Sequence, residues 1–192
     1  MKKVVDRIKY LADIVAELPL AKRVEFSFLV AARMSPLLKR YKLKFRGAND
    51  FEFDLGTLWK NFSDGNISKI DQTLRISETS IPDCESETDR LCIFAQNAAI
   101  CFVNVCNLIL NMDSSLVGRI IENYFDTIDY VAQDSLGISE SRADTDELVI
   151  NSNFFATEFE HLIERVELLR KNTSVDLNML ENERISSPFY SE

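Results

Sequence analysis

Apolar residues recur at intervals of three and four along most of the chain, which is the spacing of one face of an α-helix. The first such run begins at Val4 and stops at Pro19. Ser35 and Pro36 are typical of a helix start, since serine suits the cap and proline the first turn. Later runs stop at glycines or polar turns. The pattern predicts helices over residues 4–18, 20–34, 36–46, 50–62, 67–79, 88–112, 116–136 and 153–171.

The predicted helix over 88–112 differs from the others because it is apolar on more than one side. Phe94, Phe102 and Ile109 lie on its main stripe, and Ile100 and Leu108 lie on the opposite side. A helix that is apolar all round is usually buried. We therefore expect this helix at the centre of the fold.

Strand signals are scarce. Residues 41–45 alternate with a period of two, but a lone strand would have no partner. We predict an all-α fold, a single-domain bundle of about eight helices spanning 1–192. Residues 172–192 show one weak turn near 175–183, and we expect them to form a weakly ordered tail.

The cysteines and the first residues bear on the compartment. Charges at Asp6 and Arg7 interrupt the apolar region that a signal peptide needs, so we expect a cytoplasmic protein. All four cysteines are then expected to be reduced thiols, since cytosolic disulfides are rare. Their spacings of 8, 9 and 5 residues match no common zinc pattern. Cys101 and Cys106 lie in an apolar run and are predicted to be small buried hydrophobes.

No membrane span is expected either, because Asn104 and Asn107 interrupt the longest apolar stretch, residues 100–110.

Charge is distributed unevenly along the chain. The net charge is −9, from 22 Lys and Arg against 31 Asp and Glu, which argues against a general nucleic-acid binder. Residues 1–46 nevertheless carry +8 and residues 47–192 carry −17. The basic residues 39–46 could contact RNA or anionic lipid, dock against the acidic remainder of the fold, or remain solvated. We favour the last two interpretations.

Two groups of residues could support chemistry. Glu158 and His161 form a Glu-x-x-His pair, which in helical di-iron proteins contributes metal ligands. His161 is the only histidine, so the second motif is impossible, and we interpret the pair as a solvated helix face. Glu122, Asp126 and Asp129 share one side of their helix and could do acid–base work, but a polar face is the favoured interpretation. We expect no enzyme, no metal and no cofactor.

Two acidic segments, residues 83–89 and 140–147, offer a negative surface to a basic partner. The chain is small, helical and free of catalytic signatures. Our hypothesis is a protein-binding module, in its sharpest form an immunity protein that neutralises a basic nuclease-type toxin. The expected partner-binding residues are Asp83, Glu85, Glu87, Asp89, Asp144, Asp146 and Glu147.

Short motifs along the chain resemble the YjaG-like family, domain-of-unknown-function family 416. They are RMSP at 33–36, ND at 49–50, LW at 58–59, IPD at 81–83 and ELVIN at 147–151 before the 155–169 helix. The resemblance spans residues 4–171 and implies an all-helical, cytoplasmic protein without an assigned activity. The basic segment and the cysteine-rich helix depart from the family pattern, so the chain resembles a divergent member. The alternative hypothesis is an uncharacterised protein of this kind, with metal or RNA binding still open.

Overall fold

The amphipathic runs fold into helices that pack around one connected core. The structure is a computed structural model that describes residues 3–45, 53–84, 89–138 and 144–190. Within those residues every regular element is a helix, and no strand occurs. The helices are α1 (Val4–Ala16), α2 (Leu20–Lys44), α3 (Leu55–Ser63), α4 (Ile67–Thr79), α5 (Arg90–Asn111), α6 (Ser115–Ser135), α7 (Thr145–Asn151), α8 (Asn153–Arg170) and α9 (Leu177–Ile185).

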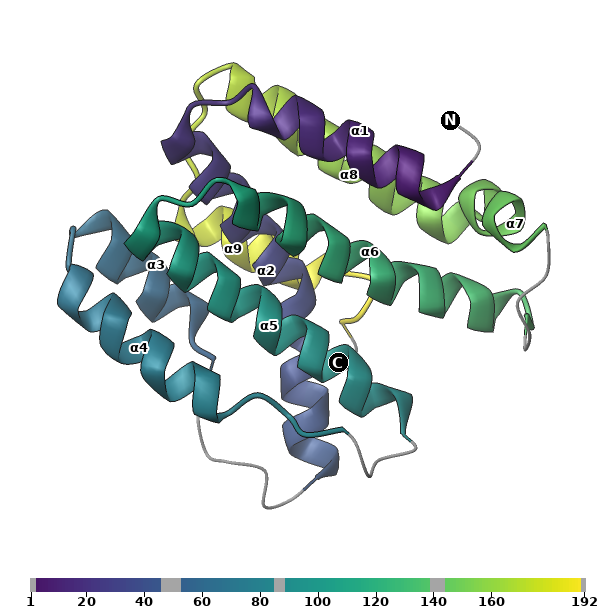
Figure 1. Cartoon of the computed structure of the whole chain (residues 1–192), viewed down its shortest axis with the longest axis horizontal. Helices are drawn as coiled ribbons and strands as arrows, with labels where there is room; N and C mark the ends of the chain where they lie inside the picture. The colour runs from purple at the N-terminus through teal and green to yellow at the C-terminus, as the bar shows by residue number, and fades with distance from the viewer. Residues whose placement is uncertain (1–2, 46–52, 85–88, 139–143, 191–192) are drawn as a thin grey trace.

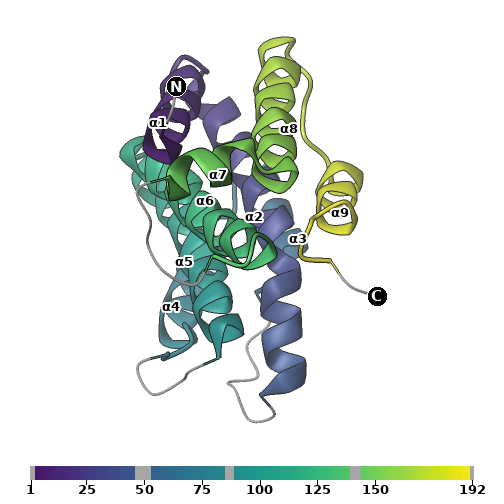
Figure 2. The same ribbon diagram turned by 90° about the vertical axis from the view of Figure 1, so that its right-hand side faces the viewer.

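Three long helices, α2, α5 and α6, form the middle of the molecule (Figures 1 and 2). Helices α1, α7 and α8 pack on one side of them, and α3 and α4 on the other. Helix α9 lies along α2. The all-α prediction is therefore confirmed.

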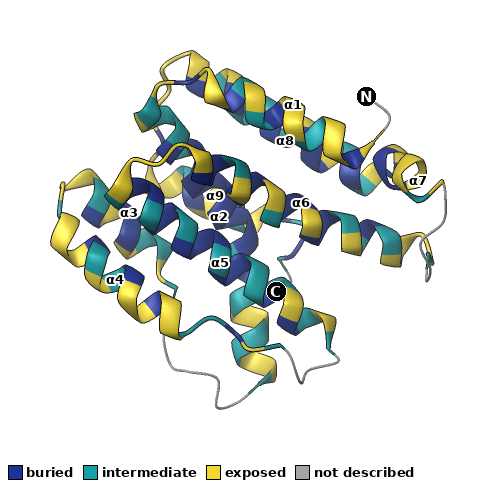
Figure 3. Ribbon diagram, in the orientation of Figure 1, coloured by how far each residue is buried: buried dark blue, intermediate teal, exposed yellow. Residues whose placement is uncertain are grey.

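Helix α5 is central, as its apolar character predicts, and packs against α2, α4 and α6. Helix α2 is equally central, and buried positions follow one another along its middle turns (Figure 3). Phe26, Phe28 and Leu29 there are inaccessible to solvent. Because its middle turns are buried on several sides, the apolar run of α2 looks continuous rather than periodic in the sequence.

Length and composition alone would allow α5 to cross a membrane, with a mean hydropathy of 1.8 over an 18-residue window. The expectation that Asn104 and Asn107 exclude a span does not hold by this measure, because the two residues do not lower the mean hydropathy enough. However, 56% of the window is buried inside the molecule, and the core helix of a soluble protein passes the same test.

The predicted break at Ser35 and Pro36 is wrong, since α2 runs through both residues to Lys44. Pro36 has no N–H to donate to the carbonyl of Ala32. The Ser35 hydroxyl supplies that hydrogen bond instead, at 2.8 Å. The Arg33 carbonyl accepts a further bond from the Ser187 hydroxyl of the C-terminal segment. The Ser35 hydroxyl thus replaces the donor that proline lacks, and the helix continues.

The C-terminal residues differ from the expected weakly ordered tail. Residues 177–185 form α9, whose N-cap Asp176 accepts from the Met179 N–H at 2.8 Å. Leu180 and Phe189 are buried against the core. The sequence does not predict this docking, because the apolar residues of the segment do not repeat regularly at helical spacing. A charged residue, Glu183, makes the ion pairs that hold α9 to α2 and α8.

Candidate functional site

A buried ionic network joins α2, α6, α8 and α9. Arg33 on α2 is 2% exposed. Its Nη2 donates to both carboxylate oxygens of Glu158 on α8, at 2.8 and 2.6 Å. The Arg33 Nε lies 3.1 Å from the hydroxyl oxygen of Tyr124 on α6, and that hydroxyl donates to Glu158. The guanidinium, the phenol and the carboxylate therefore satisfy one another away from water.

Glu183 on α9 completes the network from the other side. It accepts from the Arg33 Nη1 at 3.0 Å and from the Arg165 Nε at 2.5 Å. The His161 Nε2 lies 2.7 Å from the same carboxylate. Two arginines thus face two glutamates, so the buried charges balance. We call the set Arg33, Tyr124, Glu158, His161, Arg165 and Glu183 the ionic network.

Burial and pairing act in opposite directions on these groups. Burial opposes the charge on Arg33, but Tyr124 and Glu158 outweigh it and raise the pKa of the guanidinium. Burial and the neighbouring Glu158 raise the pKa of the Tyr124 phenol well above its usual value. Burial also opposes the charge on Glu183, but hydrogen bonding to His161 and the nearby cations lower the pKa of that carboxyl. These shifts favour the charged forms of Arg33 and Glu183 and the neutral form of the Tyr124 phenol.

The solvated interpretation of Glu158 and His161 is wrong, because Glu158 is only 5% exposed and is bound by Arg33. Among the residues that the structure describes, no three His, Cys, Asp or Glu side chains gather as a metal site would require. Sequence reasoning missed Arg33, Tyr124 and Glu183. Arg33 left a usable signal, since it interrupts the apolar run 28–34.

A second group of carboxylates lies on the surface across α6 and α7. Glu122, Asp126 and Asp129 follow one another on α6 at helical spacing. Asp146 extends the group from the first turn of α7. Burial, then Glu122 and Asp129, raise the pKa of Asp126. Burial, then Asp146, raise the pKa of Asp129 despite a hydrogen bond to Gln133.

We call Glu122, Asp126, Asp129 and Asp146 the α6–α7 acidic face. Besides burial, the charged groups that raise pKa values on this face are other carboxylates. Neighbouring carboxylates on the face therefore repel one another when they are ionised. From the sequence, the first three are candidates for acid–base chemistry and Asp146 is a candidate for partner binding. The structure brings the four together.

The remaining predicted partner-binding residues that the structure describes lie in two separate regions, the start of α7 and the α4–α5 connection. Asp144 and Glu147 are exposed beside Asp146 at the start of α7. Asp83 is exposed near the start of the α4–α5 connection, which lies away from α7 (Figures 1 and 2). Asp89 caps α5 by accepting from the Leu91 N–H at 2.9 Å and also pairs with Lys44. Glu85 and Glu87 lie outside the described residues.

The basic end of α2 is partly neutralised within the fold. Lys44 pairs with Asp89, and this contact, followed by the Leu91 N–H, lowers the pKa of the Asp89 carboxyl. Lys39 lies close enough to Glu181 on α9 to lower the pKa of that carboxyl, after the larger effect of Arg184. These contacts support the interpretation that the basic segment docks against the acidic remainder of the chain.

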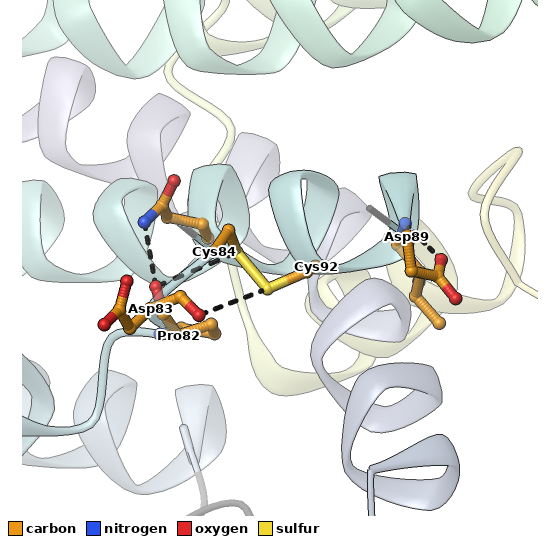
Figure 4. The surroundings of a disulfide bond; sticks show 7 residues. Pro82, Asp83, Cys84, Asp89 and Cys92 are labelled. Carbon is orange, nitrogen blue, oxygen red and sulfur yellow. Dashed lines mark hydrogen bonds between the residues drawn. A yellow bond between two sulfur atoms is a disulfide. The ribbon is translucent and has the colours of Figure 1, made fainter. Parts of the chain in front are cut away.

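The expectation of four reduced thiols is wrong for two of the cysteines. Cys84 and Cys92 form a disulfide that joins the α4–α5 connection to the first turn of α5 (Figure 4). Cys101 and Cys106 are free and buried, as predicted. Burial raises the pKa of both thiols to about 12. The spacing of eight residues carries no signal for the bond, because the contact depends on how the connection folds back on the helix.

A cleft opens between α2, α3 and α9, with a volume of about 940 Å³. Pro36, Leu55 and Leu180 contribute apolar surface to it, and Lys39 and Glu181 contribute charges. One wall is the start of the α4–α5 connection, Ile81, Pro82 and Asp83. The volume and mixed lining are typical of a ligand or peptide site. We call this hollow the α2–α9 cleft.

Comparison with known proteins supports the fold and leaves the activity open. No protein-family model matches the chain, and no curated protein matches it. Among solved structures, the chain is similar to a DUF416 family protein from Shewanella baltica OS155. The two share 15% sequence identity with a TM-score of 0.64, over 90% of each chain.

The fold is therefore that of a helical protein from a family of unknown function, as the short motifs predicted. Two of those motifs lie at features described above. The tetrapeptide at 33–36 holds Arg33 of the ionic network and the serine that carries α2 past its proline. The tripeptide at 81–83 forms a wall of the α2–α9 cleft. At this identity the likeness concerns the fold alone.

Proposed function

We propose that the chain is a non-enzymatic protein-binding module whose α6–α7 acidic face binds a basic protein domain. In its sharpest form it is an immunity protein that neutralises a basic nuclease-type toxin. The observation that carries the proposal is the cluster of four carboxylates on α6 and α7, where neighbouring carboxylates add to the effect of burial and raise the pKa values of Asp126 and Asp129. A cationic partner would relieve that repulsion and would be attracted over a distance before contact.

The exposed Asp144 and Glu147 extend the negative surface next to this face. Opposite charges across an interface mainly speed association and select partners. A nuclease domain must present cations to bind phosphate, so an acidic face can cover the same cations. The proposal favours α7 over the segment near Asp83 and Asp89, because Asp89 already has Lys44 as its partner.

The ionisable and nucleophilic side chains in the described core support a non-enzymatic role, because they are not available to a substrate. Arg33 and Arg165 pair with Glu158 and Glu183, and burial makes the thiols of Cys101 and Cys106 hard to ionise. A general base or nucleophile must be available to a substrate. These groups are instead occupied by one another or by the core.

The test has two stages. First, the tagged chain is used to capture partners from its own cells at low salt, and is co-expressed with each captured basic protein that is toxic to those cells. We expect capture of a basic protein and rescue of growth. Second, association with the captured protein is timed for the triple variant Asp126→Asn, Asp129→Asn, Asp146→Asn at low and high salt.

The triple variant should associate more slowly at low salt and lose most of the salt dependence. A matched control, Glu78→Gln, Glu160→Gln, Glu164→Gln, removes the same charge from exposed positions on α4 and α8. It should behave like the original chain. Equal effects of the two triple variants would show a general charge effect and refute the assignment of the face. Absence of any basic partner would refute the proposal as a whole.

A further inference from the structure

The disulfide lies at a junction between the α4–α5 connection and α5. The Cys84 and Cys92 Cα atoms are 5.7 Å apart, across a sequence separation of eight residues. Cys84 is partly exposed, whereas Cys92 is inaccessible to solvent. Figure 4 shows the bond between Cys84 in the connection and Cys92 on the helix. Although it is buried, Cys92 is not part of the connected core cluster.

The same segment has two further contacts. The side-chain amide of Gln96 on α5 donates to the Pro82 carbonyl at 2.8 Å, and Ile81 packs against the core. Together with the disulfide, these contacts position Ile81, Pro82 and Asp83, which form a wall of the α2–α9 cleft.

The size of the core argues against a purely structural staple. Small secreted domains need disulfides because their cores are too small. This chain has an extensive connected core drawn from most of its helices, and the bond lies beside that core. Breaking the bond would therefore remove the covalent attachment of the segment to α5, loosen it and leave the core in place.

We propose that the Cys84–Cys92 disulfide is a reversible redox clamp on the wall of the α2–α9 cleft, opened by a dithiol reductant. The bond fixes the wall when oxidised and releases it when reduced. The proposal goes beyond the binding role of the acidic face, which lies elsewhere on the molecule, and stands or falls independently of it.

The exchange follows from the exposure of the two sulfurs. A thiolate of the dithiol attacks the partly exposed Cys84 Sγ, the Cys84–Cys92 bond breaks, and Cys92 leaves as a thiolate. Cys92 is the third residue of α5 and is inaccessible to solvent, so the leaving sulfur takes up a proton and ends as a buried thiol. The second thiol of the reductant then attacks the mixed disulfide. The products are two cysteine thiols and a cyclic disulfide, and two electrons and two protons pass to the protein.

The experiment uses the whole purified chain equilibrated with reduced and oxidised dithiothreitol at set ratios. Acid quenching, alkylation and peptide mass spectrometry give the oxidised fraction of the Cys84–Cys92 pair. Hydrogen exchange is measured on both states. In the reduced state we expect roughly tenfold faster exchange at Leu91 and Cys92, with α1 and α8 unchanged.

An anilinonaphthalene sulfonate dye reports on the cleft itself, since its rings suit the apolar floor and its sulfonate suits Lys39. We expect the dye to bind several-fold more weakly after reduction. Cys84→Ser and Cys92→Ser should each reproduce the reduced state and no longer respond to the dithiol. Cys101→Ala, a change at a free buried cysteine, should keep the response.

Three results would overturn the proposal. The pair could stay reduced at every ratio, so that no clamp forms. The bond could survive until the protein unfolds, which would make it a structural staple. Exchange and dye binding could be equal in the two states, so that the bond controls nothing. None of these outcomes would change association at the α6–α7 acidic face, so failure here is distinguishable from failure of the proposed function.

Discussion

Arg33 keeps its charge in the core because carboxylates from two other helices bind it. Removing water from an ion is costly, and the cost is offset only when hydrogen bonds and opposite charges replace the water. Glu158 and Glu183 supply both to Arg33. The network therefore makes the packing of α2, α8 and α9 depend on three particular side chains.

The first prediction concerns Glu158. Glu158→Gln keeps the shape of the side chain but removes the charge that Arg33 faces, leaving a buried cation short of a partner. We expect the free energy of unfolding to fall by about 3 kcal/mol, measured by urea denaturation. Glu160→Gln makes the same substitution at an exposed position on the same helix and should cost less than about 0.5 kcal/mol. Equal losses would show that the charge of Glu158 is not what stabilises the fold.

The second prediction concerns Asp129, whose pKa in the folded state is raised by burial and by Asp146. A carboxyl with a raised pKa destabilises the folded state when it is ionised. Asp129→Asn should therefore be more stable than the original chain at pH 7, by less than about 1 kcal/mol. The advantage should shrink as the pH falls through the raised pKa of the folded state. It should vanish below the value of the unfolded chain, about 3.9.

Thermal melting at pH 7 and pH 3 checks this pH dependence. Asp13→Asn, at an exposed position on α1, is the control and should show little change at either pH. A loss of stability in Asp129→Asn at pH 7 would contradict the repulsion on which the acidic face depends.

At the scale of elements, the continuity of α2 past Pro36 depends on the Ser35 hydroxyl, because proline has no N–H to donate. The Ser35 hydroxyl donates to the Ala32 carbonyl at 2.8 Å, and Pro36 cannot. Ser35→Ala should leave that carbonyl without a donor and cost about 1–2 kcal/mol in denaturant unfolding. In a Pro36→Ala background the backbone N–H returns, so the same serine substitution should cost much less.

The chain contains a matched control on α6. Ser135 donates to the Ala132 carbonyl with the same spacing and the same distance, 2.8 Å. That carbonyl also accepts from the Leu136 N–H, so Ser135→Ala should cost less than about 0.5 kcal/mol. Equal costs at the two serines would mean that Pro36 plays no part.

The sequence predicted the elements that depend on local pattern. Helix α4 begins and ends where its apolar spacing indicates, and the all-round apolar α5 is central. The break expected at Pro36 is a local error, because the Ser35 hydroxyl replaces the missing donor within the helix. The other errors arise where a distant residue decides. Ser187 binds the Arg33 carbonyl, and Glu183 docks α9 through charges on two other helices. The acidic face also needed the fold, because Asp146 approaches Asp129 only through the packing of α7 on α6.

At the scale of the whole molecule, the shared core and the ionic network predict cooperative unfolding. Most of the buried apolar residues that the structure describes form one connected cluster drawn from most of the helices, and the network ties α8 and α9 to α2. Helices coupled in this way should unfold together, in one transition.

The chain carries two built-in probes for this prediction, its only tryptophan and its only histidine. Trp59 lies on α3 and His161 on α8, on opposite sides of the central helices (Figure 1). Trp59 fluorescence and the imidazole proton signal of His161 should report the same urea midpoint. Glu158→Gln should lower both midpoints equally, because loss of the network weakens the whole fold. A lower midpoint at His161 alone would instead divide the chain into two cooperative units, with α1, α7 and α8 opening before the rest.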